Sequence, residues 1–196
     1  MEMRGVILGS SSVYRRKLME RLQIPFEVEA PDFDEASVKE LDLPAMETAQ
    51  QLARSKARIV ASRHPHDIVI GSDQIAAASQ NGAIFDKPGS ADGAIEQLRS
   101  LRGKEHQLLT AVAIAHSDQL VEFCDVTRLQ MRDLSDQEIE RYVAADKPLD
   151  CAGSYKIESL GLMLFERIDS HDQTAIQGLP LMRLGQELRA LGLQAP

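Results

Sequence analysis

The chain contains no tryptophan, and aromatic residues make up only 4% of its 196 residues. Single-stranded nucleic acids are usually held by aromatic side chains on which bases stack, and few are available here. The formal net charge of -8 at pH 7 points the same way, because proteins that bind nucleic acid polymers replace counterions with a positive surface. Both shortages argue against a nucleic acid polymer as partner, whereas a small anion can still bind in a locally basic pocket.

Cysteine is also scarce, with only Cys124 and Cys151. Two cysteines do not form the disulfide framework of a small secreted protein, so we expect two reduced packing residues. The sequence has no run of about 18 apolar residues, the length that a membrane-spanning helix needs. Its first residues lack the apolar core of a signal peptide. We therefore expect a cytoplasmic protein without a membrane segment.

The residues that are present follow a mixed α/β pattern. Short apolar runs predict strands, and apolar residues at a spacing of three to four predict helices. The expected strands cover residues 6–8, 26–30, 68–70, 75–78, 83–85, 108–115, 121–131 and 162–168. The expected helices cover 47–62, 90–101 and 180–193, with one more after the glycine–serine segment 9–12 and one from a capping box at Ser135 and Glu138. No repeat or linker interrupts the pattern, so residues 1–196 are predicted to form a single α/β domain.

A loop of small residues, Gly9 to Ser12, connects the first strand to the first helix. Such a loop offers backbone N–H groups and the positive end of a helix dipole, which suit a phosphate. Arg15 and Arg16 lie in the first helical turn, where positive charge is unfavourable unless an anion compensates it. We predict a phosphate site formed by this loop and both arginines. The alternative is that Ser12 only caps the helix and both arginines are solvated.

A second polar segment, Gly71-Ser72-Asp73-Gln74, follows the buried strand at 68–70, and its first three residues are predicted to form a turn. Ligands of α/β proteins gather at the carboxyl ends of strands. Asp73 is therefore a candidate to hold a divalent metal or to activate a water molecule. The alternative is an aspartate that satisfies the backbone of the turn.

Two lysines, Lys56 and Lys87, are candidate site residues only in combination with these two segments. Lys56 follows the apolar stripe of its helix, and Lys87 stands in Asp86-Lys87-Pro88. Each lysine by itself is predicted to be a surface residue.

Six segments taken together resemble the Maf family of nucleotide pyrophosphatases. They occur in the family's order and span nearly the whole chain: Gly9-Ser10-Ser11-Ser12 with Arg15, Phe33-Asp34-Glu35, Leu52-Ala53-Arg54-Ser55-Lys56-Ala57, Gly71-Ser72-Asp73-Gln74, Asp86-Lys87-Pro88 and Leu179-Pro180. The resemblance implies a mixed α/β fold related to that of the inosine triphosphatases, with two lobes around a cleft. It also implies hydrolysis of a nucleoside triphosphate between the α and β phosphates, with a divalent cation, Mg or Mn, as cofactor.

The resemblance further implies a role for each matching residue. Asp73 would be the general base that activates the attacking water and would help to hold the metal, and Glu35 would be a second metal-associated carboxylate. The residues implied to contact phosphate are Ser10, Ser12, Arg15, Lys56 and Lys87. Cations and a metal are expected to converge where charge develops on phosphoryl oxygens.

Three positions depart from the common family pattern. Many members have Pro-Arg where this chain has Val13-Tyr14, Thr in place of Gln74, and Gln in place of Glu158. The departures resemble the branch that hydrolyses 7-methyl-GTP. Methylation at N7 gives guanine a positive charge, which the face of Tyr14 would attract, and Glu158 can accept hydrogen bonds from the guanine N1–H and amino group.

Two other functions stay open at this point. One is a pyrophosphatase for dTTP and UTP, which Gln74 and Glu158 argue against. The other is a nucleotide-binding regulator of cell division in which hydrolysis is secondary, which an intact Asp73 and Glu35 argue against. The expected partner is a small nucleotide. A homodimer stays open, because an exposed apolar strand edge would support one, although the sequence does not locate such an edge.

Overall fold

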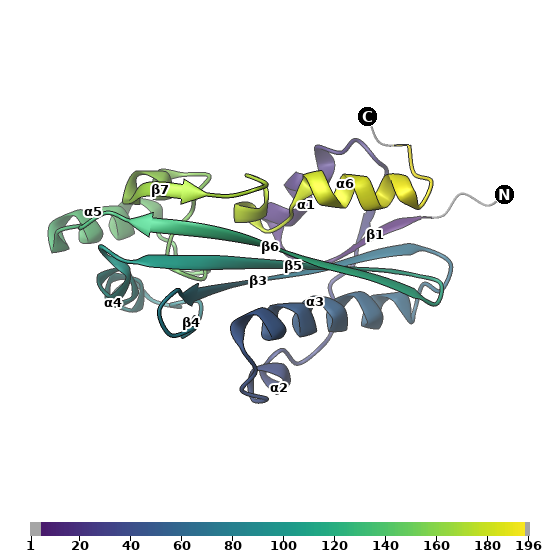
Figure 1. Ribbon diagram of the computed structural model, residues 1–196, viewed down its shortest axis with the longest axis horizontal. Coiled ribbons are helices and arrows are strands. Elements are labelled where there is room, and N and C mark those ends of the chain that lie inside the picture. Colours follow the sequence, from purple (N-terminus) through teal and green to yellow (C-terminus); the bar gives the residue numbers. More distant parts are fainter. Residues whose placement is uncertain (1–4, 195–196) are drawn as a thin grey trace. The chain divides into compact units, whose positions relative to one another are not determined.

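The structure is a computed structural model that describes residues 5–194, and it has the expected mixed α/β fold (Figure 1). Hydrogen bonds connect the strands in the order β2-β1-β3-β5-β6-β7, and β4 pairs with β3. The strands are β1 (Val6–Gly9), β2 (Glu27–Val28), β3 (Ile68–Ala78), β4 (Ile84–Phe85), β5 (Glu105–His116), β6 (Gln119–Met131) and β7 (Phe165–Asp169). The helices are α1 (Val13–Glu20), α2 (Ala36–Lys39), α3 (Ala45–Ala61), α4 (Ala91–Leu101), α5 (Asp136–Asp146) and α6 (Leu181–Ala190), with short 3-10 turns η1 (Leu160–Leu164) and η2 (Ala175–Gln177). Within the described range, none of these helices has the length and apolar character to cross a membrane.

The chain divides into two compact units. The first contains the chain up to Asp73, residues Thr110–Asp125 and the chain from Asp172 onward. The second contains Gln74–Leu109 and Val126–His171.

The first unit is built on parallel strands. β1 pairs with β2 on one side and with β3 on the other, and the pairing with β3 sets Val6 opposite Ile68 and Gly9 opposite Gly71. All four residues of β1 are buried, as expected for parallel strands that are covered on both faces. Helices α1 and α6 contribute Leu18, Leu184 and further apolar side chains to the same core.

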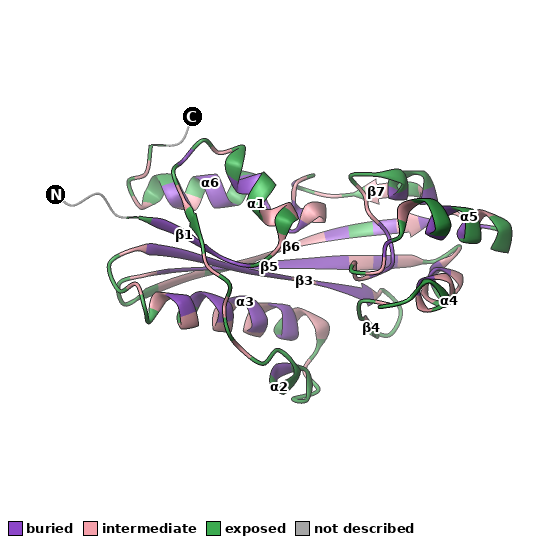
Figure 2. Ribbon diagram, turned by 180° about the vertical axis from the view of Figure 1, so that it is seen from behind, coloured by how far each residue is buried: buried purple, intermediate pink, exposed green. Residues whose placement is uncertain are grey.

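Helix α3 packs closely on this sheet. Its buried residues recur at helical spacing and form a single stripe, whereas most residues between them are only partly buried (Figure 2). The stripe consists of Thr48, Ala49, Leu52, Ala53, Lys56, Ala57 and Val60. Gly71 sets the distance of approach: a Cβ atom there would lie only 2.4 Å from the carbonyl oxygen of Ala53 and 2.5 Å from the backbone nitrogen of Ala57. Glycine in the strand and alanines in the helix therefore bring the two backbones together.

Two predicted boundaries were wrong. Residues 71–73 do not form a turn, because β3 continues through them to Ala78. Their polar side chains find partners inside the protein, so polarity at this point does not mark a reversal of the chain. In the predicted strand at 162–168, residues up to Leu164 belong to η1 and the strand begins at Phe165.

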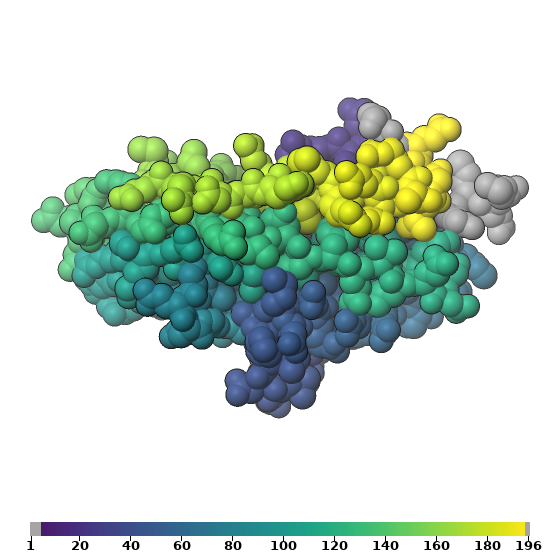
Figure 3. Space-filling view, viewed as in Figure 1, coloured from purple at the N-terminus to yellow at the C-terminus, as the bar shows by residue number. Residues whose placement is uncertain are grey.

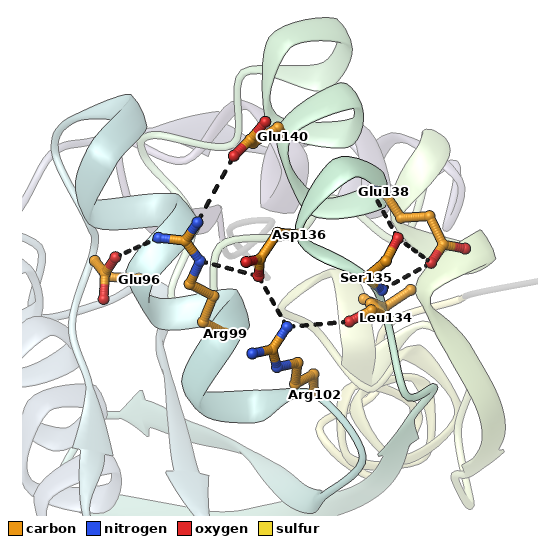
Figure 4. Close-up of polar contacts among 8 residues, drawn as sticks. All are labelled: Glu96, Arg99, Arg102, Leu134, Ser135, Asp136, Glu138 and Glu140. Atoms are coloured by element: carbon orange, nitrogen blue, oxygen red, sulfur yellow. Dashed lines mark hydrogen bonds and ion pairs between the residues drawn. The ribbon is translucent and has the colours of Figure 1, made fainter.

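In the second unit, charged side chains join α4 to α5 (Figure 4). The Asp136 carboxylate accepts from Arg99 at 3.2 Å and from Arg102 at 2.8 Å. At the start of α5 the predicted capping box is present: Ser135 Oγ accepts from the Glu138 backbone, and Glu138 accepts from the Ser135 backbone at 2.8 Å. The ion pairs are exposed and each adds little to stability, whereas the capping box fixes where α5 begins.

The second unit contains a cluster of three rings, His106, Tyr155 and Phe165. His106 is fully buried, and its Nε2 lies 2.9 Å from the hydroxyl of Tyr155. Tyr155 packs edge-on against Phe165 with ring centroids 4.8 Å apart. The other ring nitrogen, His106 Nδ1, has no hydrogen-bond partner among the described residues. Burial lowers the pKa of His106 to about 4, so the ring is neutral at neutral pH.

This buried histidine is expected to make the protein sensitive to acid. An unfolded histidine has a pKa of 6.5, above the value of about 4 in the fold, so the unfolded state binds a proton first as the pH falls. The free energy of unfolding should then decrease between pH 6.5 and pH 4, by about 2.5 kcal/mol at pH 4.5. Urea unfolding of the wild type and of His106→Gln at pH 7 and pH 4.5 tests this. The free energy of unfolding should fall by about 2.5 kcal/mol less in His106→Gln than in the wild type. Equal losses in both proteins would rule out His106 as the cause.

Candidate active site

The loop between β1 and α1 has the geometry of an anion-binding helix start. The Oγ atom of buried Ser10 accepts a hydrogen bond from the backbone N–H of Ser12 at 3.2 Å. Ser12 is the N-cap of α1 and accepts from the backbone N–H of Arg15 at 3.4 Å. The first turn of α1 contains no acidic residue, so the positive end of the helix dipole is not offset locally.

The two arginines of this turn point in different directions. Arg15 donates from Nε to the carbonyl oxygen of Gly178 at 3.1 Å and from Nη1 to Ser10 at 3.3 Å. Burial of the guanidinium lowers the pKa of Arg15, and the carboxylates of Asp73 and Glu35 oppose this shift. Arg16 is exposed and pairs with Glu20, one turn further along α1, at 3.2 Å. The structure therefore places Arg15, and not Arg16, at the loop.

The carbonyl of Gly178 links the loop to strand β3. It accepts a hydrogen bond from Arg15 and another from the buried hydroxyl of Ser72 at 2.9 Å. Gly178 has a φ of 110°, a conformation that side chains rarely adopt. A Cβ atom there would also lie 3.1 Å from Arg15 Nε. Neither Ser72 nor Gly178 was predicted as a site residue, because a bond to a backbone carbonyl leaves no signature in residue types.

A buried aspartate holds the segment around Gly178 in place. Asp172 accepts from the backbone and hydroxyl of Thr174, at 2.9 and 2.6 Å, and from the backbone of Met182 at 2.7 Å. Thr110 on β5 donates to the carbonyl of Ala175 at 3.0 Å. The position of the Gly178 carbonyl is thus fixed from both ends of its segment.

Next to this loop, one ammonium group joins two carboxylates. Lys56 Nζ donates to Asp73 Oδ1 at 2.5 Å and lies 2.7 Å from Glu35 Oε1. The side chains of Lys56 and Asp73 are only 7% and 11% exposed, whereas that of Glu35 is 50% exposed. Glu35 stands at the start of α2, whose segment projects from the surface in Figure 3.

Lys56 is thus buried, and its prediction as a surface lysine was wrong. It occupies the apolar stripe of α3, one turn after Leu52 and one before Val60, so its stem packs toward the sheet. Asp73 lies two residues after Gly71 on β3 and therefore on the same face of the strand. The close approach of α3 at Gly71 brings the ammonium to the carboxylate.

The arrangement in the first unit combines two cations, Arg15 and Lys56, with two carboxylates, Asp73 and Glu35. Hard carboxylate oxygens are the ligands that Mg²⁺ and Mn²⁺ prefer. Within residues 5–194 no group of three or more His, Cys, Asp or Glu side chains could hold a metal ion. Two carboxylates fit Mg²⁺, which is typically bound by one or two carboxylates together with substrate phosphates and water.

The remaining predicted residues lie elsewhere in the chain. Tyr14 is half-buried on α1, in the first unit. In the second unit, Gln74 is half-buried on β3, and Lys87 is exposed in the segment before α4, as expected for a surface lysine. Glu158 is exposed and follows a segment that is tied down at several points. There the Ser154 hydroxyl donates to Gln97 at 2.6 Å and the backbone of Lys156 donates to the Tyr142 hydroxyl at 3.0 Å.

Comparison with known proteins gives a consistent result. The sequence profile described as Maf-like protein matches residues 5–191. A protein of Aromatoleum aromaticum named 7-methyl-GTP pyrophosphatase is 48% identical over 193 residues, covering 97% of each chain. Proteins with the same name from Bdellovibrio bacteriovorus and Pseudomonas aeruginosa are each 42% identical, covering 98% and 99% of this chain and 100% of their own.

Among solved structures, a HAM1 protein from Coxiella burnetii is similar to this chain with a TM-score of 0.50. The two are 13% identical in sequence, and the match covers 96% of this chain and 100% of the other. At this identity the likeness concerns the fold alone. The profile match across nearly the whole chain and the similarity to full-length relatives lead to one conclusion: the chain belongs to the Maf family.

Proposed function

We propose that this protein hydrolyses nucleoside triphosphates to the monophosphate and pyrophosphate, with 7-methyl-GTP as its preferred substrate. The observation that carries the proposal is the convergence of Lys56, Asp73 and Glu35 beside the Ser10–Arg15 loop. In this proposal, a carboxylate that would accept a proton lies next to groups that would bind phosphate. The names of relatives that are 42–48% identical over nearly their full length support the same reaction and substrate.

The loop and its cations would bind the triphosphate. The N-terminus of α1 offers backbone N–H groups to phosphate oxygens. The Ser10 hydroxyl accepts from Arg15 and from the Ser12 backbone, and its own O–H can donate to a phosphate oxygen. Arg15 and Lys56 carry the positive charge that stabilises a developing pyrophosphate. The family resemblance assigns phosphate binding to Lys87 as well, a residue of the second unit in the segment before α4.

A divalent cation, Mg²⁺ or Mn²⁺, is part of the proposal. Asp73 and Glu35 would hold it, and substrate phosphates and water would complete its coordination. When bound, the ion would polarise phosphoryl oxygens and neutralise part of their charge.

Asp73 would act as the general base. Its carboxylate would accept a proton from a water molecule as the water oxygen bonds to a phosphorus atom of the α–β bridge. The bond from that phosphorus to the bridging oxygen breaks, and the nucleoside monophosphate and pyrophosphate separate. A general base must lie within hydrogen-bond reach of the water whose proton it accepts. Asp73 meets this requirement if the triphosphate binds at the Ser10–Arg15 loop, because its carboxylate interacts with Arg15.

Base recognition is assigned to Tyr14 and Glu158, with Gln74 beside Asp73. The face of Tyr14 would attract the positive charge of 7-methylguanine. Glu158 would accept hydrogen bonds from the N1–H and the amino group of guanine. Pyrimidine bases do not carry two donors in this arrangement. The anchoring of residues 154–156 would keep Glu158 in a constant position.

Pyrophosphate release from a panel of triphosphates with Mg²⁺ tests this proposal. The wild type should prefer 7-methyl-GTP to GTP, dTTP and UTP in kcat/KM. Glu158→Gln should lose about tenfold or more of that preference through a weakened hydrogen-bond pair, while the exposed control Glu166→Gln should not. A preference for dTTP or UTP in the wild type would refute the assignment of the substrate.

A further inference from the structure

We propose that the ammonium of Lys56 serves as the resident cation of the metal-free site, and that a divalent metal and this ammonium exclude each other until a nucleotide draws Lys56 away. The proposal deepens the proposed function, because it assigns an order to metal and substrate at that site. It rests on that function only for the identity of the anion that releases Lys56.

The contacts of Lys56 are those of a buried counter-ion. Its Nζ lies 2.5 Å from Asp73 and 2.7 Å from Glu35, and only 7% of its side chain is exposed. A charge in such a position is stable only when it is paired. Lys56 therefore offsets one of the two carboxylate charges without any bound ion. Arg15, whose guanidinium interacts electrostatically with both carboxylates, supplies a second positive charge nearby.

The same contacts define where a metal would lie. Because both carboxylate oxygens touch one Nζ atom, they are no more than about 5 Å apart. An ion with Mg–O distances of about 2.1 Å holds two ligands about 4 Å apart or closer. A small shift of exposed Glu35 gives this spacing, and the ion would then occupy the region in which Nζ lies. Two cations cannot share that space at an acceptable electrostatic cost.

A triphosphate changes this balance. Bound at the N-terminus of α1 and at Arg15, it would bring several anionic oxygens close to Lys56. The flexible lysine stem then allows the ammonium to turn from carboxylates to phosphates. Once Lys56 has turned away, Asp73 and Glu35 can hold the metal, and Asp73 can accept a proton from water. In this proposal both events require a bound substrate. The metal would thus enter together with the nucleotide.

Titration calorimetry with Mn²⁺ alone, without nucleotide, tests the proposal. Lys56→Met should bind Mn²⁺ about tenfold more tightly than the wild type or better, because a cation close to the metal position has been removed. Lys56→Arg keeps the charge and should bind as weakly as the wild type. Lys104→Met, an exposed lysine of the second unit, is the matched control and should change nothing. Equal or weaker Mn²⁺ binding by Lys56→Met would overturn the proposal.

Removal of Lys56 is expected to destabilise the fold, because the buried carboxylate of Asp73 then loses the cation that contacts it directly. Thermal unfolding turns this loss into a second measurement: Mn²⁺ should raise the Tm of Lys56→Met by several degrees more than that of the wild type. If Mn²⁺ did not reduce the difference in Tm between Lys56→Met and the wild type, the metal would not replace the ammonium of Lys56, and the proposal would be wrong. Both measurements omit nucleotide, so they remain valid if the wild type fails to hydrolyse any triphosphate, and the panel assay reports that failure separately.

Discussion

Replacement of Asp73 by asparagine is expected to lower kcat for 7-methyl-GTP by about a thousandfold, within the range that a general base contributes. Asparagine has nearly the same shape as aspartate but cannot accept the proton of the attacking water. Lys56 keeps its pairing with Glu35, and the Ser10–Arg15 loop is unchanged. We therefore expect a folded protein that still binds the nucleotide, as measured by calorimetry with a non-hydrolysable analogue.

The matched control for this variant is Asp118→Asn. Asp118 is exposed between β5 and β6, so the same chemical change there should leave kcat at the wild-type value. Retention of more than a tenth of the wild-type kcat in Asp73→Asn would remove Asp73 from the role of base. A loss of nucleotide binding with unchanged turnover at saturation would instead assign it to substrate binding.

Replacement of Gly71 by alanine is expected to destabilise the protein by about 3 kcal/mol, at the upper end of the cost of overpacking. The added Cβ would lie 2.4 Å from the Ala53 carbonyl oxygen and 2.5 Å from the Ala57 nitrogen. Both are backbone atoms of α3, so no side-chain rotation relieves the contact. Helix α3 must move outward, and Lys56 moves with it. Urea unfolding should show the loss, and the folded protein should have a reduced kcat as well.

Gly185→Ala provides the control for this prediction. Gly185 lies in α6, and a Cβ there would meet only the end of the Arg189 side chain at 3.4 Å. Alanine within a helix is favoured over glycine, so this variant should be neutral or more stable by up to about 1 kcal/mol. If Gly71→Ala were as stable as Gly185→Ala, the close packing of α3 on β3 would not be what positions Lys56.

Most elements of the fold could be predicted from the sequence, because their signals are local. The apolar run at Val6–Gly9 and the stripe of α3 reflect burial directly, and Ser135 and Glu138 define a helix start by their spacing alone. The predicted turn at 71–73 was wrong because of contacts that are distant in sequence. Ser72 and Asp73 are polar because Gly178 and Lys56 meet them inside the fold, and those partners are distant in sequence.

The candidate site shows the same division. Gly9–Ser12, Arg15 and Asp73 were predicted from residue type and from the family resemblance, and the structure places all of them in the first unit. The local charge pattern could not separate Arg16 from Arg15, although the family resemblance named only Arg15. In the fold, the carbonyl of Gly178, distant in sequence, accepts from Arg15. Lys56 appears as a surface lysine until Gly71 is known to bring its helix against β3.

The products formed by the wild-type protein from 7-methyl-GTP test the central claim most directly. Phosphorus NMR of the reaction with Mg²⁺ should show pyrophosphate and 7-methyl-GMP appearing in equal amounts, with no orthophosphate at early times. Orthophosphate together with 7-methyl-GDP would place the cleavage at the wrong phosphoanhydride bond. That result, or the absence of any turnover, would contradict the account.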